Sequence, residues 1–448
     1  MTLSKFIYTL EEGQHYYLIQ TKTRRVFEIK KECYLQIKSG GIPVDYLDES
    51  EYKLFQDAEI IIPDRLDEVD ILERDCINND NPNEWHSLHI IPTAACNFGC
   101  DYCFVLKDKK SNICDNMISD DILYSGIDFF FNGNESNDVI ATFYGGEPLL
   151  TPSVIYKAVD YIENTLKKRV NKKIITNGSL ITPEIAEYLA QHEFDVNVSL
   201  DGNKKAHDTF RVYKSGKSSY DDVVTGIKLL MDKGNSVKVL MTVGDFNAGE
   251  LAECVKSILA LKPTTVALNL PKALQYSENG IEKNIDYAGL LDAYVQCVDM
   301  CYDSHIPEGH MADIIFGFLR EKVQYRPCHG CGKQIALTPN GLIGPCQAYL
   351  GTQKYFINMK EYKSISDLRE NEIFKKWEAI TMYSSQKCRS CYLLPVCPGD
   401  CPYDWENRSG DLTNPPDTYC KSRKKMFDYM IRRLVRGQEI LFKPKKRE

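Results

Sequence analysis

The chain has 448 residues, of which 43% are hydrophobic, and this is enough for two or three domains with buried cores. Its net charge is −8 and its only dense basic run is Lys443 to Arg447, so we expect no nucleic-acid partner. The first 20 residues lack a signal-peptide pattern, and no apolar window approaches the roughly 20 residues that cross a bilayer. We therefore expect a cytoplasmic protein with no membrane segment.

Residues 1–85 form the first predicted domain. Short stretches alternate apolar with polar residues and are separated by turn residues, which predicts hairpins at Phe6–Tyr8, Tyr16–Ile19 and Arg25–Ile29. Helical runs are predicted at Lys30–Ile37 and Glu49–Gln56. This order resembles the small winged-helix-like domain that recognises leader peptides on many peptide-modifying enzymes. The alternative is a capping subdomain with no ligand, and the acidic stretch from Asp64 to Glu84 is expected to be a linker.

Residues 86–310 form the second predicted domain, in which strands alternate with helices. The expected strands are Leu88–Thr93, Val139–Tyr144, Lys173–Thr176, Val196–Leu200, Val237–Val243 and Thr265–Leu270. The expected helices are Val154–Lys168, Pro183–Gln191, Tyr220–Asp232 and Ala248–Leu261. This alternation predicts an α/β fold, a partial (β/α)6 TIM-like barrel whose ligands lie at the carboxyl ends of parallel strands.

Cysteine usage indicates metal ligation. The chain has 17 cysteines, and reducing cytosol disfavours disulfides. Cys96, Cys100 and Cys103 are spaced C-x3-C-x2-C, so they can serve three irons of a 4Fe–4S cluster and leave the fourth open. An open iron can chelate an amine and a carboxylate, which the methionine part of S-adenosylmethionine supplies. A zinc loop or buried thiols are the simpler alternatives.

The triplet, with the aromatic Tyr102 just before its last cysteine, resembles the signature of the radical S-adenosylmethionine (radical SAM) superfamily. The resemblance implies that one electron from the cluster splits S-adenosylmethionine and releases a 5′-deoxyadenosyl radical.

Further motifs follow the predicted strands in the order that this family shows. Two glycines can bring backbone close to a ligand, and a carboxylate can accept from an ammonium group. The resemblance implies cofactor contacts at Tyr102, Gly145, Gly146, Glu147, Pro148, Asn177, Ser199, Asp201 and Arg211. For Arg211, a structural ion pair is an equal alternative.

Residues 311–448 form the third predicted domain, whose cysteine spacing resembles the SPASM extension of radical enzymes that modify peptides and proteins. By that resemblance Cys331, Cys346 and Cys401 bind a first auxiliary 4Fe–4S cluster, with Cys328 as its possible fourth ligand. A second auxiliary cluster would be bound by Cys388, Cys391, Cys397 and Cys420. The expected cofactors are therefore three 4Fe–4S clusters and S-adenosylmethionine. The remaining cysteines are expected to be small buried groups: Cys33, Cys76, Cys114, Cys254, Cys297 and Cys301.

Anaerobic sulfatase-maturating enzymes share both cysteine fields, but their pattern has an aspartate base where this chain has Gln347, and an amide cannot accept the proton. The sequence therefore favours a maturase that installs a thioether or carbon–carbon cross-link in a ribosomally made precursor peptide. Alternatives are another radical modification, such as formylglycine formation or epimerisation, and a non-catalytic metal-binding scaffold. The expected partners are the leader-bearing peptide and a reductant such as ferredoxin or flavodoxin. No acid or base can be assigned from one chain.

Overall fold

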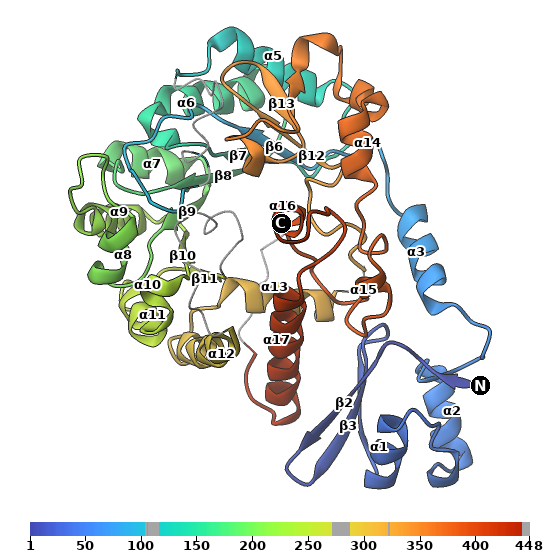
Figure 1. Cartoon of the computed structure of the whole chain (residues 1–448). Helices are drawn as coiled ribbons and strands as arrows, with labels where there is room; N and C mark the ends of the chain where they lie inside the picture. The colour runs from blue at the N-terminus through green and yellow to red at the C-terminus, as the bar shows by residue number, and fades with distance from the viewer. Residues whose placement is uncertain (104, 106–115, 271–286, 321–322, 441–448) are drawn as a thin grey trace.

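A large, mainly parallel sheet forms the centre of the computed structural model, which describes residues 1–103, 105, 116–270, 287–320 and 323–440 (Figure 1). Its strand order is β11-β10-β9-β8-β7-β6-β12-β13-β14. The strands β6 to β11 are parallel throughout and span Ser87–Ile90, Ile140–Phe143, Asn171–Thr176, Asp195–Ser199, Val237–Thr242 and Thr265–Asn269. The predicted α/β class and all six predicted strands of this region are confirmed.

Helices cover the outer side of this sheet, and Figure 1 shows them following its curve. They are α5 (Asp120–Phe131), α6 (Pro152–Asp160) with the π-helix η3 (Tyr161–Thr165), α7 (Pro183–Gln191), α8 (Lys204–Phe210), α9 (Tyr220–Asp232), α10 (Asp245–Ala248) and α11 (Leu251–Leu259). Alternate strand residues such as Leu88, Ile174 and Val239 are fully buried against these helices in one continuous core. The short η2 (Pro148–Leu150) precedes α6.

The C-terminal part extends the same sheet and then turns to short helices. Strand β12 (Gln334–Leu337) pairs parallel with β6, and β13 (Leu342–Gly344) and β14 (Ile357–Asn358) continue antiparallel. The helices are α12 (Tyr287–Asp303), α13 (Gly309–Leu319), η5 (Gln347–Tyr349), η6 (Met359–Glu361), η7 (Ile365–Glu370), α14 (Glu372–Glu378), α15 (Gln386–Arg389), α16 (Pro402–Ser409) and α17 (Asp417–Val435). None of the described helices is long and apolar enough to cross a bilayer.

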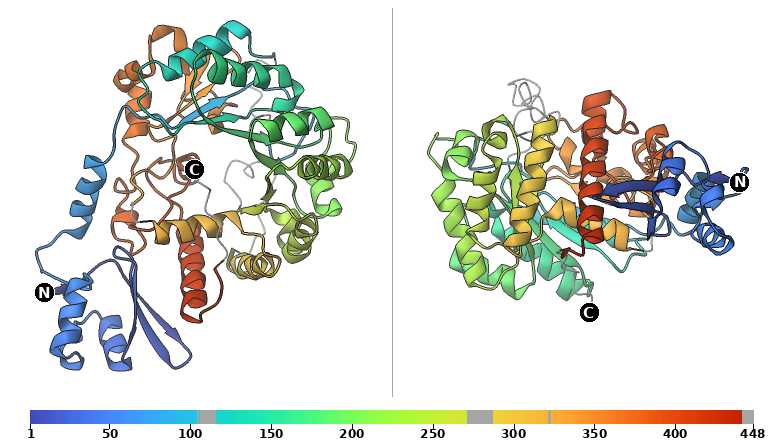
Figure 2. Two further views of the ribbon diagram at one scale, coloured as in Figure 1. Left: turned by 180° about the vertical axis from the view of Figure 1, so that it is seen from behind. Right: turned by 90° about the horizontal axis from the view of Figure 1, so that it is seen from below.

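The N-terminal unit is a three-stranded antiparallel sheet followed by helices. Its order is β2-β3-β4, formed by Ile7–Glu12, His15–Gln20 and Arg25–Ile29, with α1 (Lys31–Lys38), η1 (Val44–Tyr46) and α2 (Glu49–Asp57) after it. Strand β1 (Thr2–Leu3) pairs with β5 (Ile61–Ile62). The predicted hairpins and both predicted helices are confirmed, and the winged-helix likeness stays a prediction. Figure 2 shows β2 and β3 beside α17.

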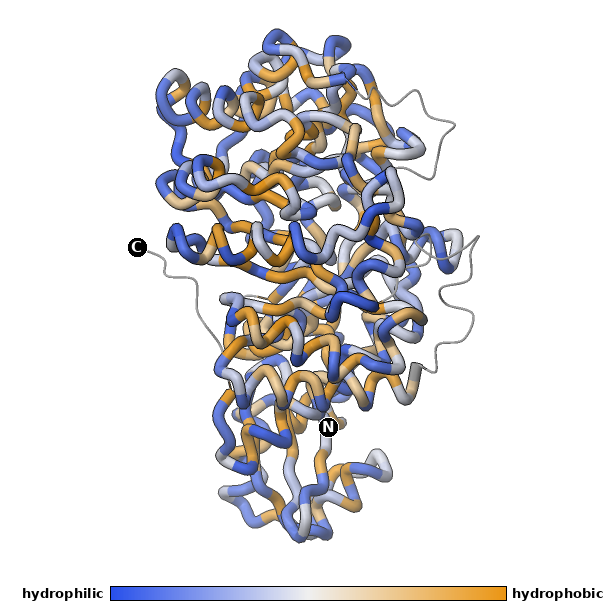
Figure 3. Tube along the Cα trace, turned by 90° about the vertical axis from the view of Figure 1, so that its left-hand side faces the viewer, coloured by the Kyte–Doolittle hydropathy of each residue, from blue (hydrophilic) through white to orange (hydrophobic). Residues whose placement is uncertain are grey.

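The predicted linker from Asp64 to Glu84 is wrong, because it contains helix α3 (Glu68–Asn78). Asp67 caps this helix, accepting from the backbone N–H groups of Val69 and Asp70. Its apolar face packs on Met382 and Tyr383 of the C-terminal part. Of the acidic residues that suggested a linker, Asp67 is the cap and Asp70 and Asp75 lie on the exposed face. Glu68 is buried and accepts from Ser4 Oγ at 2.6 Å. Figure 3 shows how hydrophilic residues line the outside while hydrophobic ones run through the interior strands.

Candidate functional site

The cysteine triplet lies on a loop that follows β6, at the carboxyl edge of the parallel sheet. Neighbouring backbone holds the loop in place. Gly99 N–H donates to the Val212 carbonyl at 2.8 Å, and Lys214 N–H donates to the Asn97 carbonyl at 3.1 Å. The fully buried Phe98 ring packs edge-on to Tyr213 at 4.9 Å. The three half-buried thiols are therefore presented by a fixed loop.

The thiols of the triplet influence one another. The pKa of Cys100 is raised to about 12, mainly by burial. The Arg211 charge lowers this pKa, and the neighbouring thiols of Cys103 and Cys96 raise it. Burial also raises the pKa of Cys96 to about 11. Thiolates grouped this way need a positive partner to become stable, and the irons of a cluster supply one. The residues present therefore fit a cluster.

Asp201, at the end of β9, ties this loop to the sheet. Its carboxylate is fully buried, and it accepts from the Tyr102 hydroxyl, from Arg211 Nε at 2.8 Å and from the backbone N–H of Thr242 at 2.8 Å. The Arg211 guanidinium also lies over the Tyr102 ring, 5.2 Å from its centroid. For Arg211 the structure gives the ion pair that the sequence offered as an alternative. Cofactor contacts by Tyr102, Asp201 and Arg211 stay predictions.

The segment Gly145-Gly146-Glu147-Pro148 lies directly against the start of the cysteine loop. A Cβ on Gly146 would stand 2.1 Å from the Ala95 carbonyl oxygen, and one on Gly145, at φ +146°, would stand 2.5 Å from that of Thr93. The close approach expected of the glycines is thus to the chain's own backbone. Buried Glu147 accepts from Thr176 Oγ1 at 2.6 Å and Asn177 N–H at 2.7 Å, and burial raises its pKa to about 7.

The polar side chains at the ends of β8 and β9 differ in whether they are already hydrogen-bonded within the protein. Asn177 Nδ2 donates to Asn97 at 2.8 Å and lies 3.9 Å from Cys96 Sγ, so it belongs to the support of the loop. Ser199 is half-buried, and its hydroxyl makes no hydrogen bond with any residue that the structure describes. Of the residues expected to contact a cofactor, Ser199 has its polar group most available.

The C-terminal cysteines form two groups. Burial raises the pKa of Cys331 well above its ordinary value, and Cys328, Cys346 and Cys401 raise it further. These four pack around Trp377 in one hydrophobic cluster. Cys328 is thus placed with the others, and Gly330 N–H donates to its sulfur at 3.3 Å.

The second group surrounds a cavity of about 280 Å³ whose lining includes Cys388, Cys391, Cys397 and Cys420. Burial raises the pKa of Cys388 to about 12, and Cys397, Cys420 and Cys391 add to the effect. No three His, Cys, Asp or Glu side chains among the described residues converge as they do around a single metal ion. A four-iron cube needs a wider set, because each thiolate binds a different iron. The cavity and its donors fit such a group.

Two residues that the sequence did not single out lie at these sites. Tyr144 packs with Cys103, and its pKa is raised by burial and by the charges of Cys103 and Cys346, so it lies between the triplet and the first C-terminal group. Arg423 lines the second cavity, and its Nε is buried without a hydrogen-bond partner among the described residues. Its position three residues after Cys420, on one helix face, was the only available signal.

Other expectations divide clearly. Cys33, Cys76, Cys254, Cys297 and Cys301 are buried, as expected, and Cys114 lies outside the described residues. Gln347 Oε1 accepts from Gln334 Nε2 at 2.9 Å, so its amide is engaged inside the C-terminal part.

Comparison with known proteins agrees with this geometry. Residues 90–258 match the family model of the Radical SAM superfamily. The radical SAM cyclopropyl synthase TigE of Paramaledivibacter caminithermalis is 22% identical, over 99% of this chain and 97% of the relative. The cysteine-type anaerobic sulfatase-maturating enzyme of Clostridium novyi is 26% identical, over 78% of this chain and 96% of the relative.

A solved structure shares the fold over nearly the whole length. Streptococcus suis SuiB, bound to its precursor peptide SuiA, has a TM-score of 0.55 at 17% identity, covering 94% of this chain and 99% of that one. The chain therefore carries a radical SAM domain. Residues 90–258 make it a radical SAM enzyme, and proteins with this domain bind a 4Fe–4S cluster and S-adenosylmethionine.

Proposed function

We propose that this enzyme is a radical SAM peptide maturase that installs an oxidative cross-link in a ribosomally made precursor peptide. Cys96, Cys100 and Cys103 would hold the cluster that binds S-adenosylmethionine. Cys328, Cys331, Cys346 and Cys401 would hold a first auxiliary cluster, and a second would be held by Cys388, Cys391, Cys397 and Cys420. When bound, the first cluster and S-adenosylmethionine supply a 5′-deoxyadenosyl radical, which removes hydrogen from unactivated carbon.

The observation that carries this proposal is the assembly of eleven cysteines into three groups in one fold. Charge interactions link the thiols within each group, and each of the two C-terminal groups draws on segments far apart in the chain. A net two-electron oxidation needs an acceptor for the second electron, and auxiliary clusters close to the radical can provide it. Tyr144 lies between the triplet and the first C-terminal group, so it would border the substrate.

The residues around the triplet would act by fixing the cofactor. The hydrogen bonds that Tyr102 and Arg211 donate to the buried Asp201 carboxylate orient the cysteine loop. Ser199 would donate to or accept from the ribose, because its half-buried hydroxyl at a strand end has no described partner. The burial of these groups would exclude water from the reacting carbon.

The N-terminal unit would hold the leader of the precursor. Among the described strands, β4 pairs with β3 on one side only, so its other edge can take up an extended peptide as a further strand. The alignments with TigE and SuiB cover 99% and 94% of the chain, which includes most of this unit. SuiB was solved with a precursor peptide, which supports a peptide substrate here.

The bond formed is the finer part of the proposal. The relative that matches nearly the whole chain is a cyclopropyl synthase, and closing such a ring makes a carbon–carbon bond. This favours the carbon–carbon cross-link over a thioether. Formylglycine formation, the reaction of the sulfatase-maturating relatives, is disfavoured because Gln347 cannot act as a base.

The first test is cofactor cleavage. Anaerobically reconstituted enzyme mixed with S-adenosylmethionine and dithionite should release 5′-deoxyadenosine. Replacing Cys96, Cys100 and Cys103 together by Ala should abolish that release while iron remains in the C-terminal groups. A wild-type protein that is fully loaded with iron and releases no 5′-deoxyadenosine would support a scaffold instead.

The second test is the product. Mass spectrometry of the precursor peptide after turnover should show the loss of two hydrogens at a new cross-link. An unchanged mass with an inverted stereocentre would indicate epimerisation. A cysteine or serine converted to an aldehyde would indicate formylglycine formation, and either product would overturn the cross-link.

A further inference from the structure

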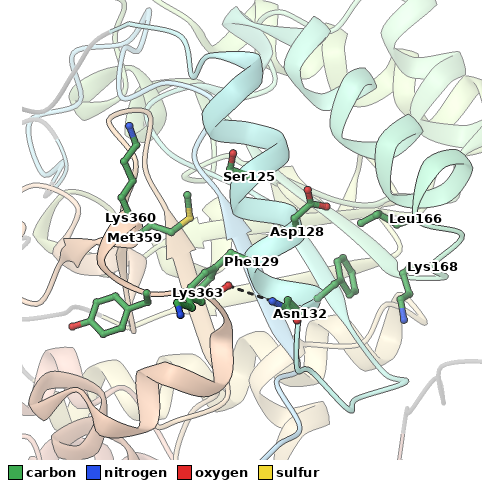
Figure 4. A pocket seen from close by; sticks show the side chains of 11 residues that line it. Ser125, Asp128, Phe129, Asn132, Leu166, Lys168, Met359, Lys360 and Lys363 are labelled. Atoms are coloured by element: carbon green, nitrogen blue, oxygen red, sulfur yellow. Dashed lines mark hydrogen bonds between the residues drawn. The ribbon is translucent and has the colours of Figure 1, made fainter.

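A hollow of about 610 Å³ lies outside all three cysteine groups, at the seam between the radical SAM core and the C-terminal part (Figure 4). One wall is α5, the second is the segment after η3, and the third is η6 with the residues after it. Apolar side chains of Phe129, Phe131, Leu166 and Met359 line it. We name this hollow the seam groove.

Lysines surround the seam groove. Lys168 stands on one side, and Lys360 and Lys363 stand on the opposite side (Figure 4). None of the three forms an ion pair with another residue in the described parts of the chain, and Lys168 lies over the Phe131 ring at 5.9 Å. The one acidic residue of the lining, Asp128, accepts from the Tyr161 hydroxyl at 2.9 Å. The groove is thus a concentration of unpaired positive charge.

The fold itself does not need these charges. Lys168 follows the end of η3 and Lys360 lies in the last turn of η6, but segments of five and three residues have little dipole for a cation to complement. The whole chain carries a net charge of −8, so an acidic protein would be repelled from most of its surface. The ammonium groups lie on opposite sides of the groove. A protein surface that carries several separated carboxylates can therefore contact them together, whereas one small anion cannot.

The groove also connects with the first C-terminal cysteine group through packed residues. Tyr362 lines the groove, and its hydroxyl accepts from Asn371 Nδ2 at 2.8 Å. Asn371 caps α14, which spans about 10 Å in its seven residues. Trp377 of α14 then packs in the cluster that contains Cys331 and Cys346. A partner seated in the groove would therefore stand about one short helix from that group.

We propose that the seam groove is the docking surface for an acidic one-electron carrier protein that reduces this enzyme. The inference rests on the proposed function, because a radical SAM reaction needs a supply of single electrons, whereas a non-catalytic metal-binding scaffold does not. The partner is recognised by its acidic surface, with one apolar side chain entering the groove. Charge complementarity would speed encounter and make it dependent on ionic strength.

The test compares two sources of electrons. Reduced flavodoxin, an acidic carrier, must dock, whereas dithionite reaches the clusters without docking. In Lys360→Glu/Lys363→Glu, and separately in Lys168→Glu, the flavodoxin-supported release of 5′-deoxyadenosine should fall by on the order of tenfold or more at low salt. Dithionite-supported release should be unchanged, which also shows that the variants are folded and loaded.

The matched control is Lys228→Glu/Lys256→Glu, which makes the same charge change at exposed positions on α9 and α11. It should leave both rates as in the wild type. Equal flavodoxin-supported rates in the groove and control variants would overturn the proposal. So would a groove variant that loses affinity for the precursor peptide and keeps its flavodoxin-supported rate. No release with dithionite in the wild type would instead overturn the proposed function.

Discussion

Asp201 shows how one buried carboxylate can set the geometry of a whole loop. Its partners come from the cysteine loop, from the residue directly after α8 and from β10, and its exposed fraction is 0%. Breaking a buried ion pair by removing one partner costs about 3 to 5 kcal/mol, so a substitution here acts through the fold. A loss of cofactor cleavage in an Asp201 variant is therefore not by itself evidence of contact with the cofactor.

The histidine beside this network should make stability depend on pH. His207 Nδ1 accepts from the backbone N–H of Asp201 at 3.2 Å, and Nε2 lies 3.0 Å from Ser219 Oγ, whose proton is given to the Arg211 carbonyl. The ring is therefore neutral with its proton on Nε2. Burial lowers its pKa to about 4, with Arg211 also lowering it against Asp201.

The neutral His207 ring contributes to the free energy of unfolding. Because its pKa in the folded protein lies below the ordinary 6.5, this contribution is complete above pH 6.5 and is lost as the pH falls towards 4. The loss should reach up to about 3 kcal/mol. Denaturant titration under anaerobic conditions at pH 7.5 and 5.5 should show a smaller pH effect in His207→Gln than in the wild type. The same pH effect in both proteins would mean that His207 protonates without cost.

Arg423 should set the potential of the proposed second auxiliary cluster. The guanidinium lines the cavity with Cys397 and lowers the pKa of that thiol against its burial, so it stabilises negative charge there. Reduction of a cluster adds negative charge. In Arg423→Met the midpoint potential should therefore become more negative, measured by redox titration of the spectroscopic signal that Cys388→Ala removes.

Two control variants accompany the measurement of the potential. Arg423→Lys keeps the charge and should restore most of the potential. Lys425→Met removes an exposed cation that pairs with Asp292 outside the cavity lining, and it should leave the potential within error of the wild type. A potential in Arg423→Met equal to that of the wild type, at full iron content, would contradict the role.

At the scale of elements, α3 joins the N-terminal unit to the C-terminal part. Arg389 beside Cys388 donates to Glu73 at 2.6 Å and to Asp70, both on this helix. Leu72 is 4% exposed in the contact with Met382 and Tyr383. The helix therefore covers one side of the second cysteine group.

Leu72→Ala should destabilise the enzyme by about 2 to 5 kcal/mol, because it opens a cavity in this contact. Denaturant unfolding measures the loss, and iron content reports whether the proposed second auxiliary cluster is retained. Arg74→Ala, on the exposed face of the same helix, should change stability by no more than about 0.5 kcal/mol. Equal effects of the two substitutions would show that α3 is not packed as described.

Elements of the core could be predicted because their signals are local. Alternation and β-branched residues mark strands such as Val237–Thr242, and Pro183–Gln191 carries its helix signals in sequence. Helix α3 escaped because its many charges hid a narrow apolar face. The cysteines of the site could be predicted because their spacing is typical of metal ligands. Tyr144 and Arg423 were missed because the residues that surround them are distant in sequence. The bond between Tyr102 and Asp201, 99 positions apart, has no local signal.

At the scale of the whole molecule, the N-terminal unit rests directly on the second cysteine group. The Tyr8 ring stacks on Tyr392, next to Cys391, with centroids 5.1 Å apart, and its hydroxyl donates to Asp428 of α17 at 2.5 Å. Glu12 pairs with Arg436 at 2.5 Å and with Arg432. If the leader binds to this unit, it would bind next to the cysteines that we propose as ligands of the second auxiliary cluster.

Deleting residues 1–65 should weaken binding of the leader peptide by orders of magnitude and leave the iron content unchanged. This deletion keeps α3 and its Asp67 cap and removes only Phe6 from the cluster that contains Met382 and Tyr383. Removing residues 1–85 would also take away Val69, Leu72 and Cys76. Fluorescence anisotropy with a labelled leader measures the affinity. An affinity equal to that of the full chain would remove the recognition role, and lost iron would show that the unit has a structural one.

Cys401 lies between Cys397 and Cys420 in the sequence but groups with Cys331 in space. This order has a consequence for how the enzyme acquires its iron in the cell. Neither C-terminal group is complete until the ribosome has made Cys401 for the one and Cys420 for the other, long after it has made the triplet. The triplet and its Asp201 anchor emerge much earlier. Biogenesis machinery would therefore meet a nascent protein able to accept the proposed S-adenosylmethionine-binding cluster first, with insertion of the two proposed auxiliary clusters following later in synthesis.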